Sequence, residues 1–145
     1  MYKSILLAID LEDETSWQQS APTAIALARA FAAELTLMTV VPDMGTTLAA
    51  NYMPDDFEAL ALDEANARLH AWVNANVPGD LAVQHVVGHG RAYEEILRIA
   101  DEIACDLIIL GARHTEKDRY PLGPNSAQVV RHADQSVLVV RATPD

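Results

Sequence analysis

Short, unbroken apolar runs alternate with longer segments of helical periodicity, and no other feature restricts the possible folds of this chain as strongly. Residues 4–9 and 107–110 are too short for helices and too continuous for strands exposed on one face. They predict central strands of a parallel sheet that is covered on both faces. Residues 35–41 and 136–140 indicate two more strands, and the weaker alternation of residues 81–87 favours an edge strand.

Apolar side chains recur at three- and four-residue intervals between these runs, which predicts helices over residues 17–31, 57–73, 93–103 and 125–132. Pro22 falls inside the first of these segments. Either the first turn is offset or kinked there, or the regular helix begins near Ser20 with the proline in its first turn.

Strands that alternate with helices predict an α/β domain with right-handed crossovers. The expected architecture is a Rossmann-like three-layer sandwich, in which helices cover both faces of a five-stranded parallel sheet of order 3-2-1-4-5. We expect residues 1–145 to form one domain, long enough to bury about two-thirds of the surface of the unfolded chain. The two most apolar strands, the first and the fourth, should lie side by side at its centre.

Ligands of open α/β sheets bind at the carboxyl ends of the strands, where the strand order reverses. Here that point lies between Asp10, which follows the first strand, and Gly111, which follows the fourth. Gly123 precedes the last helix, whose N-terminal N–H groups would face an anion. A glycine also lets a ligand approach the backbone, since it has no Cβ. The sequence therefore predicts a phosphate site within residues 106–126.

A formal net charge of −11 argues against nucleic acid and anionic membrane surfaces as partners. A bound nucleotide would need local compensation from backbone N–H groups, a few cations and a divalent ion such as Mg²⁺. The candidate cations gather in one loop, at Arg113, His114, Lys117 and Arg119. Because acidic residues are interleaved with them, a solvated loop of mixed charge explains Lys117 and Arg119 equally well.

The other chemistry-bearing residues favour neither a catalytic nor a metal centre. Ser126 lacks the strand-to-helix elbow of a hydrolase nucleophile, and the sequence contains no Walker-type Gly-Lys-Ser/Thr phosphate loop. His85 and His89 lie four residues apart, without a third ligand in view. Cys105, the one cysteine, suits packing in a reducing compartment. With no signal-peptide or membrane-spanning pattern, we expect a cytoplasmic location.

Four parts of the sequence together resemble the universal stress protein family, namely residues 8–10, 40–43, Gly111 and, most specifically, residues 122–141. In the last part, a glycine-containing helix start precedes Arg-His-Ala and then Ser-Val-Leu-Val-Val. The resemblance covers essentially the whole chain. It implies a protein that binds ATP or AMP in a stress or regulatory response, with slow ATP hydrolysis or self-phosphorylation as the most activity expected.

The family pattern, carried onto this chain residue by residue, puts adenine and ribose beside the first two strands and the phosphates at the loop and the last helix. The implied nucleotide-binding residues are Ala8, Ile9, Asp10, Val40, Gly111, Arg113, His114, Gly123, Pro124, Asn125 and Ser126. Two positions depart from the family pattern: His114 replaces a glycine, and Pro124, which has no N–H, replaces a serine or threonine. Asp10 fits a ribose contact or a metal held through water, and it also fits a cap of its own turn or of the next helix.

Residues 137–140 would form an apolar edge strand, which invites aggregation unless it is covered. Antiparallel pairing across a twofold axis, as the resemblance implies, predicts a homodimer through Val137, Leu138, Val139 and Val140. Two functions then remain open. The dimer is an adenine-nucleotide sensor, or it is a nucleotide-free module that presents residues 43–54 to a protein partner such as a solute transporter.

Overall fold

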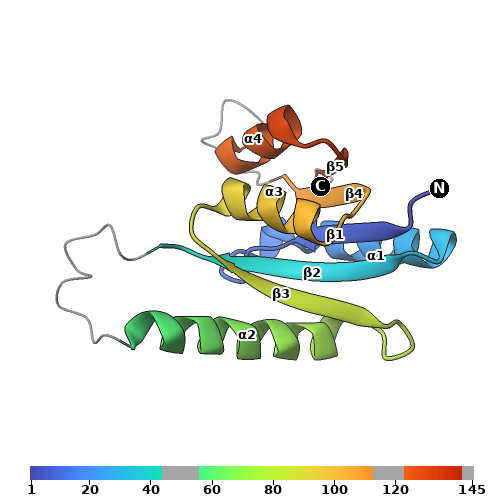
Figure 1. Cartoon of the computed structure of the whole chain (residues 1–145). Coiled ribbons are helices and arrows are strands. Elements are labelled where there is room, and N and C mark those ends of the chain that lie inside the picture. Colours follow the sequence, from blue (N-terminus) through green and yellow to red (C-terminus); the bar gives the residue numbers. More distant parts are fainter. Residues whose placement is uncertain (44–55, 113–122, 142–145) are drawn as a thin grey trace.

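Parallel pairing of five strands organises the described part of the chain (Figure 1). This computed structural model describes residues 1–43, 56–112 and 123–141. The strands are β1 (Ser4–Ala8), β2 (Glu34–Val41), β3 (Val83–His89), β4 (Leu107–Gly111) and β5 (Ser136–Val140). Between them lie the 3₁₀ turn η1 (Glu14–Ser16) and the helices α1 (Ser20–Phe31), α2 (Phe57–Asn76), α3 (Ala92–Glu102) and α4 (Pro124–His132).

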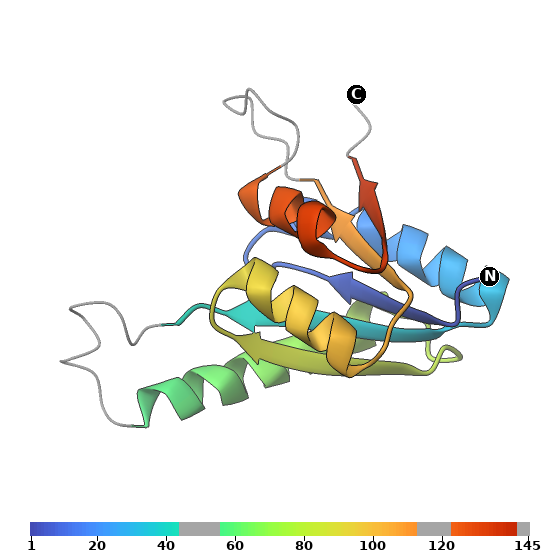
Figure 2. The same cartoon turned by 45° about the horizontal axis from the view of Figure 1, so that its top comes forward.

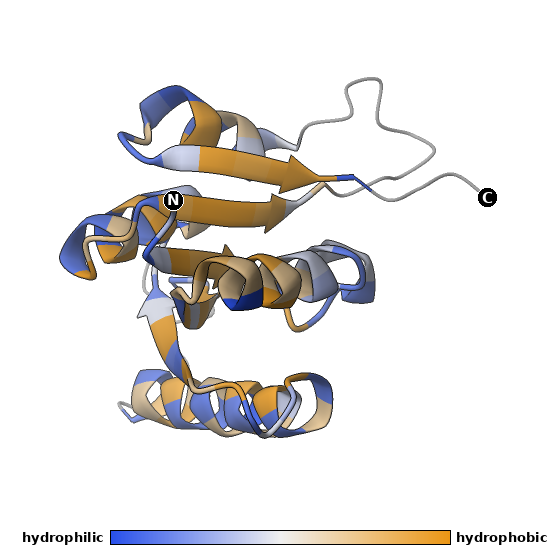
Figure 3. Cartoon of the chain, turned by 90° about the vertical axis from the view of Figure 1, so that its right-hand side faces the viewer, coloured by the Kyte–Doolittle hydropathy of each residue, from blue (hydrophilic) through white to orange (hydrophobic). Residues whose placement is uncertain are grey.

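The spatial order β3-β2-β1-β4-β5 confirms the predicted topology, with β1 and β4 adjacent. Alternate side chains of β1 enter two separate cores. Ile5 and Leu7 pack with buried residues of α1 and α2, whereas Leu6 packs with buried residues of α3 and α4. Figure 2 shows α3 and α4 on the near face of the sheet. In Figure 3 most of the strands carry the colour of hydrophobic residues. The three-layer sandwich is therefore confirmed.

The element boundaries differ from the predicted ones where pairing or capping overrides the local pattern. β3 begins two residues later than expected, because Leu81 donates its N–H to Pro78 in a turn. It extends through Gly88 and His89, which pair with the end of the long strand β2. Gly90, which follows the strand, has a positive φ of 130°, a conformation that glycine adopts without steric cost.

Both prolines near helix starts lie in the first turn of their helix. α1 begins at Ser20, which settles the two alternatives for Pro22 in favour of a regular helix with the proline in its first turn. α4 begins at Pro124, one residue earlier than predicted, since proline is already set for the first helical position.

Cys105 is a packing residue, as expected from the sequence. Its side chain is buried against α3 and α4 in the second core. Burial, and secondarily the charge of Asp106, raises the pKa of the Cys105 thiol to about 11. The thiol therefore stays protonated at neutral pH, where it is a poor nucleophile.

None of the helices within residues 1–43, 56–112 and 123–141 is long and apolar enough to cross a bilayer.

Candidate functional site

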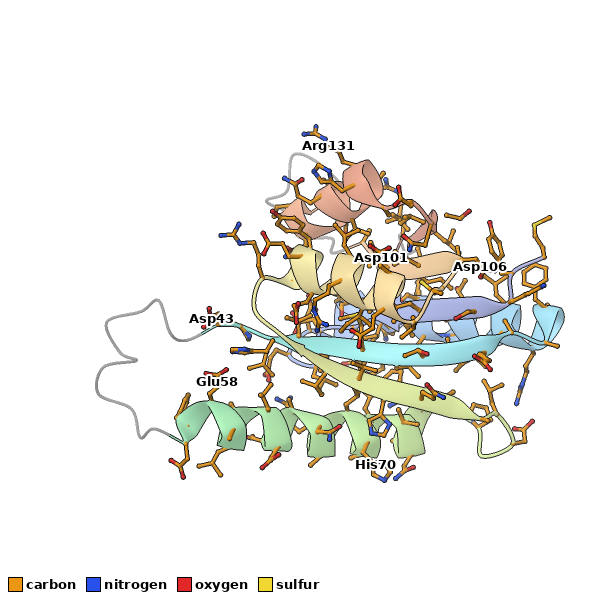
Figure 4. All side chains as sticks on the ribbon, viewed as in Figure 1. Asp43, Glu58, His70, Asp101, Asp106 and Arg131 are labelled. Carbon is orange, nitrogen blue, oxygen red and sulfur yellow. The ribbon has the colours of Figure 1, made fainter. Side chains whose placement is uncertain are left out.

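A cleft of about 700 Å³ opens at the carboxyl ends of β1, β2 and β4, on the left in Figure 1. Its walls come from the turn after β1, the end of β2, the first half of α2 and the starts of α3 and α4. Figure 4 shows Asp43 and Glu58 at this end of the molecule and Asp106 at the opposite end. The cleft thus lies where the reversal of strand order predicts a ligand.

All the implied nucleotide-binding residues that the structure describes line this one cleft. They are Ala8, Ile9, Asp10, Val40, Gly111, Gly123, Pro124, Asn125 and Ser126. Arg113 and His114 lie outside the described residues, so their part in the site stays a prediction. Segments more than a hundred residues apart in the chain therefore meet at the predicted place.

Small side chains leave the cleft open. Ala8 lines it from β1, Ala61 and Ala65 from α2, and Ala92 from α3. The α2 wall is missing from the sequence-based site, although Ala61, Ala65 and Arg68 recur at helical spacing. That spacing is the one signal from which the wall could be found, and it looks the same for a helix face buried in a core.

Asp10 makes hydrogen bonds within its own turn and also lines the cleft. Its Oδ1 accepts the N–H of Glu12 at 2.9 Å, which is the turn-capping alternative raised by the sequence. Its N–H donates to Ser16 Oγ at 3.0 Å, and the Ser16 hydroxyl donates to the carbonyl of Asp13 at 2.7 Å. Ser16, which the sequence did not single out, therefore ties the turn after β1 together and also lines the cleft.

Gly111 makes room for protein backbone. A Cβ at this position would lie 2.0 Å from the carbonyl oxygen of Ser16, a distance that no packing adjustment of a side chain relieves. The sequence predicted that the missing side chain admits a ligand. That steric reason is corrected here: although Gly111 lines the cleft, the atom that approaches it is Ser16 O.

The N-terminus of α4 forms another wall of the cleft. Gly123 precedes the helix, with φ −65° and ψ 165°, and no side chain caps this end through a hydrogen bond in the described part of the chain. Asn125 and Ser126 lie in the first turn, where N–H groups have no acceptor within the helix. Together with the helix dipole, these amides favour an anion at this wall.

Arg68 joins α2 to the turn after β1, and both partners of this contact line the cleft. Its Nη1 donates to Glu12 Oε1, and both side chains are about half exposed or more. This hydrogen bond, followed by the negative charges of Glu12, Glu64 and Asp10, raises the pKa of the Arg68 guanidinium. Among the lining residues that the structure describes, Arg68 has the only cationic side chain. The same lining contains three carboxylates, those of Asp10, Glu12 and Glu64.

The histidines of β3 lie outside the cleft. His85 contacts His70 of α2, with ring centroids 5.4 Å apart, and His89 Nδ1 lies 3.1 Å from Glu58 Oε1. Figure 4 shows His70 and Glu58 toward opposite ends of α2. Within the described ranges, no group of three or more His, Cys, Asp or Glu side chains could hold a metal ion.

Known proteins resemble this chain in both sequence and fold. A sequence model of the universal stress protein family matches residues 1–141. Universal stress protein G of Escherichia coli O157:H7 is 27% identical over 143 residues, which span 97% of this chain and 100% of that protein. A universal stress protein in complex with cAMP is 24% identical, with a TM-score of 0.62 and 98% of both chains covered. The universal stress protein from Archaeoglobus fulgidus in complex with dAMP is 16% identical, with a TM-score of 0.60 and 95% and 97% covered.

Replacement of Gly111 by alanine should destabilise the fold, because the added Cβ meets the carbonyl of Ser16. We expect a loss of about 3 kcal/mol or more in the free energy of unfolding, measured by urea denaturation. Gly123→Ala is the matched control, since a Cβ there meets no atom within 4 Å in the part of the chain that the structure describes. Equal stability of both variants would contradict the close approach of Ser16 to Gly111.

Proposed function

Because this chain belongs to the universal stress protein family, we propose that its cleft binds an adenine nucleotide, either AMP or ATP with Mg²⁺. The observation that carries the proposal is that two walls share one cleft: the start of α4, with its free amides, and Asp10 after β1 line the same hollow. The volume of about 700 Å³ is typical of small-molecule sites. The cAMP and dAMP bound by two proteins of the same fold support the choice of adenine.

In this proposal the two walls receive different parts of the nucleotide. The phosphates lie at the N–H groups of Asn125 and Ser126, where the helix dipole favours negative charge. A ribose hydroxyl donates to the carboxylate of Asp10. The adenine packs on the apolar surface beside Val40, and the small side chains of Ala61 and Ala65 line the same cleft.

The nucleotide would act as the signal of a stress or regulatory sensor. It stabilises one arrangement of the site by binding that arrangement more tightly, and a partner then reads the change. We propose the cytoplasm as the location, where the free thiol of Cys105 stays reduced. No catalytic residue is assigned.

The dimer in this proposal uses β5. This strand pairs only with β4 among the described strands, so its other edge presents unpaired backbone groups. Val137, Leu138, Val139 and Val140 are each half-buried. Antiparallel pairing with the same strand of a second copy would cover the edge and the exposed parts of these side chains.

Nucleotide binding is tested by acid release of any retained AMP or ATP from the purified chain, followed by calorimetric titration with AMP and Mg-ATP. We expect a dissociation constant below millimolar for at least one of them. No retained nucleotide, together with binding weaker than millimolar, would favour the nucleotide-free module that contacts a protein partner.

Gly123→Val should abolish this binding, because a branched side chain at the start of α4 blocks approach to its amides. The φ and ψ of Gly123 suit any residue, and a Cβ there meets no atom of the described residues within 4 Å, so the fold should persist. Gly79→Val is the control, since a Cβ at Gly79 also meets nothing and this residue lies outside the cleft. Retained affinity in the Gly123 variant would mean that the phosphates lie elsewhere.

Ala65→Phe should weaken nucleotide binding about tenfold or more by filling the α2 wall of the cleft. Ala67→Phe, an exposed position on the same helix, is the matched control and should bind like the unmodified chain. Calorimetry measures both, with circular dichroism to confirm the helix content. Equal affinities would show that the ligand does not contact α2.

Sedimentation equilibrium at micromolar concentration should show a dimer. Val139→Glu should shift it to monomer without loss of secondary structure, because like charges would oppose each other across the twofold axis. A monomer before any substitution would refute the dimer and leave the nucleotide proposal intact.

A further inference from the structure

Arg68 lines the cleft but belongs to no sequence motif, and its contacts lead to Asp10. We infer that Arg68 is a positioning residue, which holds Asp10 through Glu12 and thereby sets how strongly the site selects a ribose hydroxyl. This inference rests on the proposed nucleotide site and goes further, since it assigns the choice between ribose and deoxyribose to a side chain of α2.

The contact between Arg68 and Glu12 joins two segments that line the cleft. Arg68 extends from α2, and Glu12 belongs to the turn that follows β1. The rings of Trp17, just after η1, and Trp72 of α2 meet edge to face at 5.4 Å, so the segment between β1 and α1 also packs on α2 through a largely buried contact. The ion pair is therefore the polar, solvent-facing part of a junction between α2 and the turn.

Glu12 passes this contact on to Asp10. Its side chain accepts from Arg68, while its backbone N–H donates to Asp10 Oδ1 at 2.9 Å. The position of the Asp10 carboxylate thus depends on where Arg68 holds Glu12. The opposite flank of Asp10 is fixed by Ser16 Oγ, which accepts the Asp10 N–H at 3.0 Å.

Charge gives Arg68 a second effect on the same carboxylate. Asp10, Glu12 and Glu64 all line the cleft, and each acts on the Arg68 guanidinium as a negative charge. Arg68 therefore offsets repulsion that would otherwise push these carboxylates apart. Without it, Asp10 would turn toward solvent more often and meet the ribose less often.

A selective loss distinguishes positioning from a general structural role. A hydrogen bond from a ribose hydroxyl to Asp10 exists in AMP and is absent from whichever deoxy form lacks that hydroxyl. A residue that only stabilises the cleft would change the affinities for AMP and its deoxy forms by the same factor. A residue that aims Asp10 changes their ratio.

The experiment titrates the full chain and its variants with adenosine, AMP, 2′-deoxy-AMP and 3′-deoxy-AMP in a calorimeter. Before substitution, AMP should bind about tenfold more tightly than one of the deoxy forms. In Arg68→Met and in Glu12→Gln this ratio should fall below about threefold. The two substitutions change the net charge in opposite directions, so a common fall identifies the contact itself as the cause. Arg68→Lys should restore part of the ratio, because it keeps the charge.

Arg29→Met is the matched control. Arg29 makes an ion pair with Asp80 between α1 and the turn before β3, and its side chain is 47% exposed against 45% for Arg68. The substitution Arg29→Met also removes one positive charge, but outside the cleft, so the ratio of the affinities for AMP and its deoxy forms should stay unchanged. In a chain that carries Asp10→Asn, the further change Arg68→Met should have no added effect on the ratio, since both act on one hydrogen bond.

Three results would overturn the inference while the proposed function survives. One is equal weakening of AMP and its deoxy forms in Arg68→Met. Another is a loss for AMP but not for adenosine with the ribose ratio intact, which would make Arg68 a phosphate ligand. The third is binding of AMP and both deoxy forms alike before any substitution. If adenosine and the nucleotides all fail to bind, the proposed function itself falls, and the inference with it.

Discussion

The contact between the carbonyl of Ser16 and the backbone of Gly111 is the constraint on which the site depends. It places the turn after β1 directly against the end of β4, beside the paired ends of the two central strands. Ser16 also accepts the N–H of Asp10 and donates to the carbonyl of Asp13, which fixes the turn internally. A rigid strand end on this flank leaves the cleft to be shaped by α2 and α4.

The order of the sheet could be predicted almost completely, because β1 and β4 are buried over residues 5–7 and 107–110, where no polar residue interrupts them. Residues 5–7 and 107–110 combine an apolar run with a length that only a strand allows, and adjacency of β1 and β4 then follows. The limits of β3 could not be predicted. The limits of β3 depend on pairing with β2. Because β2 extends to Val41, Gly88 and His89 pair with its last two residues and belong to β3.

The site was predictable where it follows from chain direction and unpredictable where it follows from packing. Asp10 and Gly123 stand at a strand end and a helix start, so topology alone brings them to the same cleft. Ser16 sits in an acidic turn that looks like an ordinary helix-start signal. Arg68 looks like an exposed charge on a long helix, because its partner Glu12 is distant in sequence.

The alanines of α2 separate the shape of the cleft from the stability of the domain. Ala61 and Ala65 line the hollow, while Leu69 and Trp72 farther along the same helix are buried in the core. Alanine has the highest helix propensity, and exchange for another unbranched residue costs the helix only a few tenths of a kcal/mol. Paralogues could therefore diverge in the molecules they accept, through single substitutions on one helical stripe, while inheriting an unchanged scaffold.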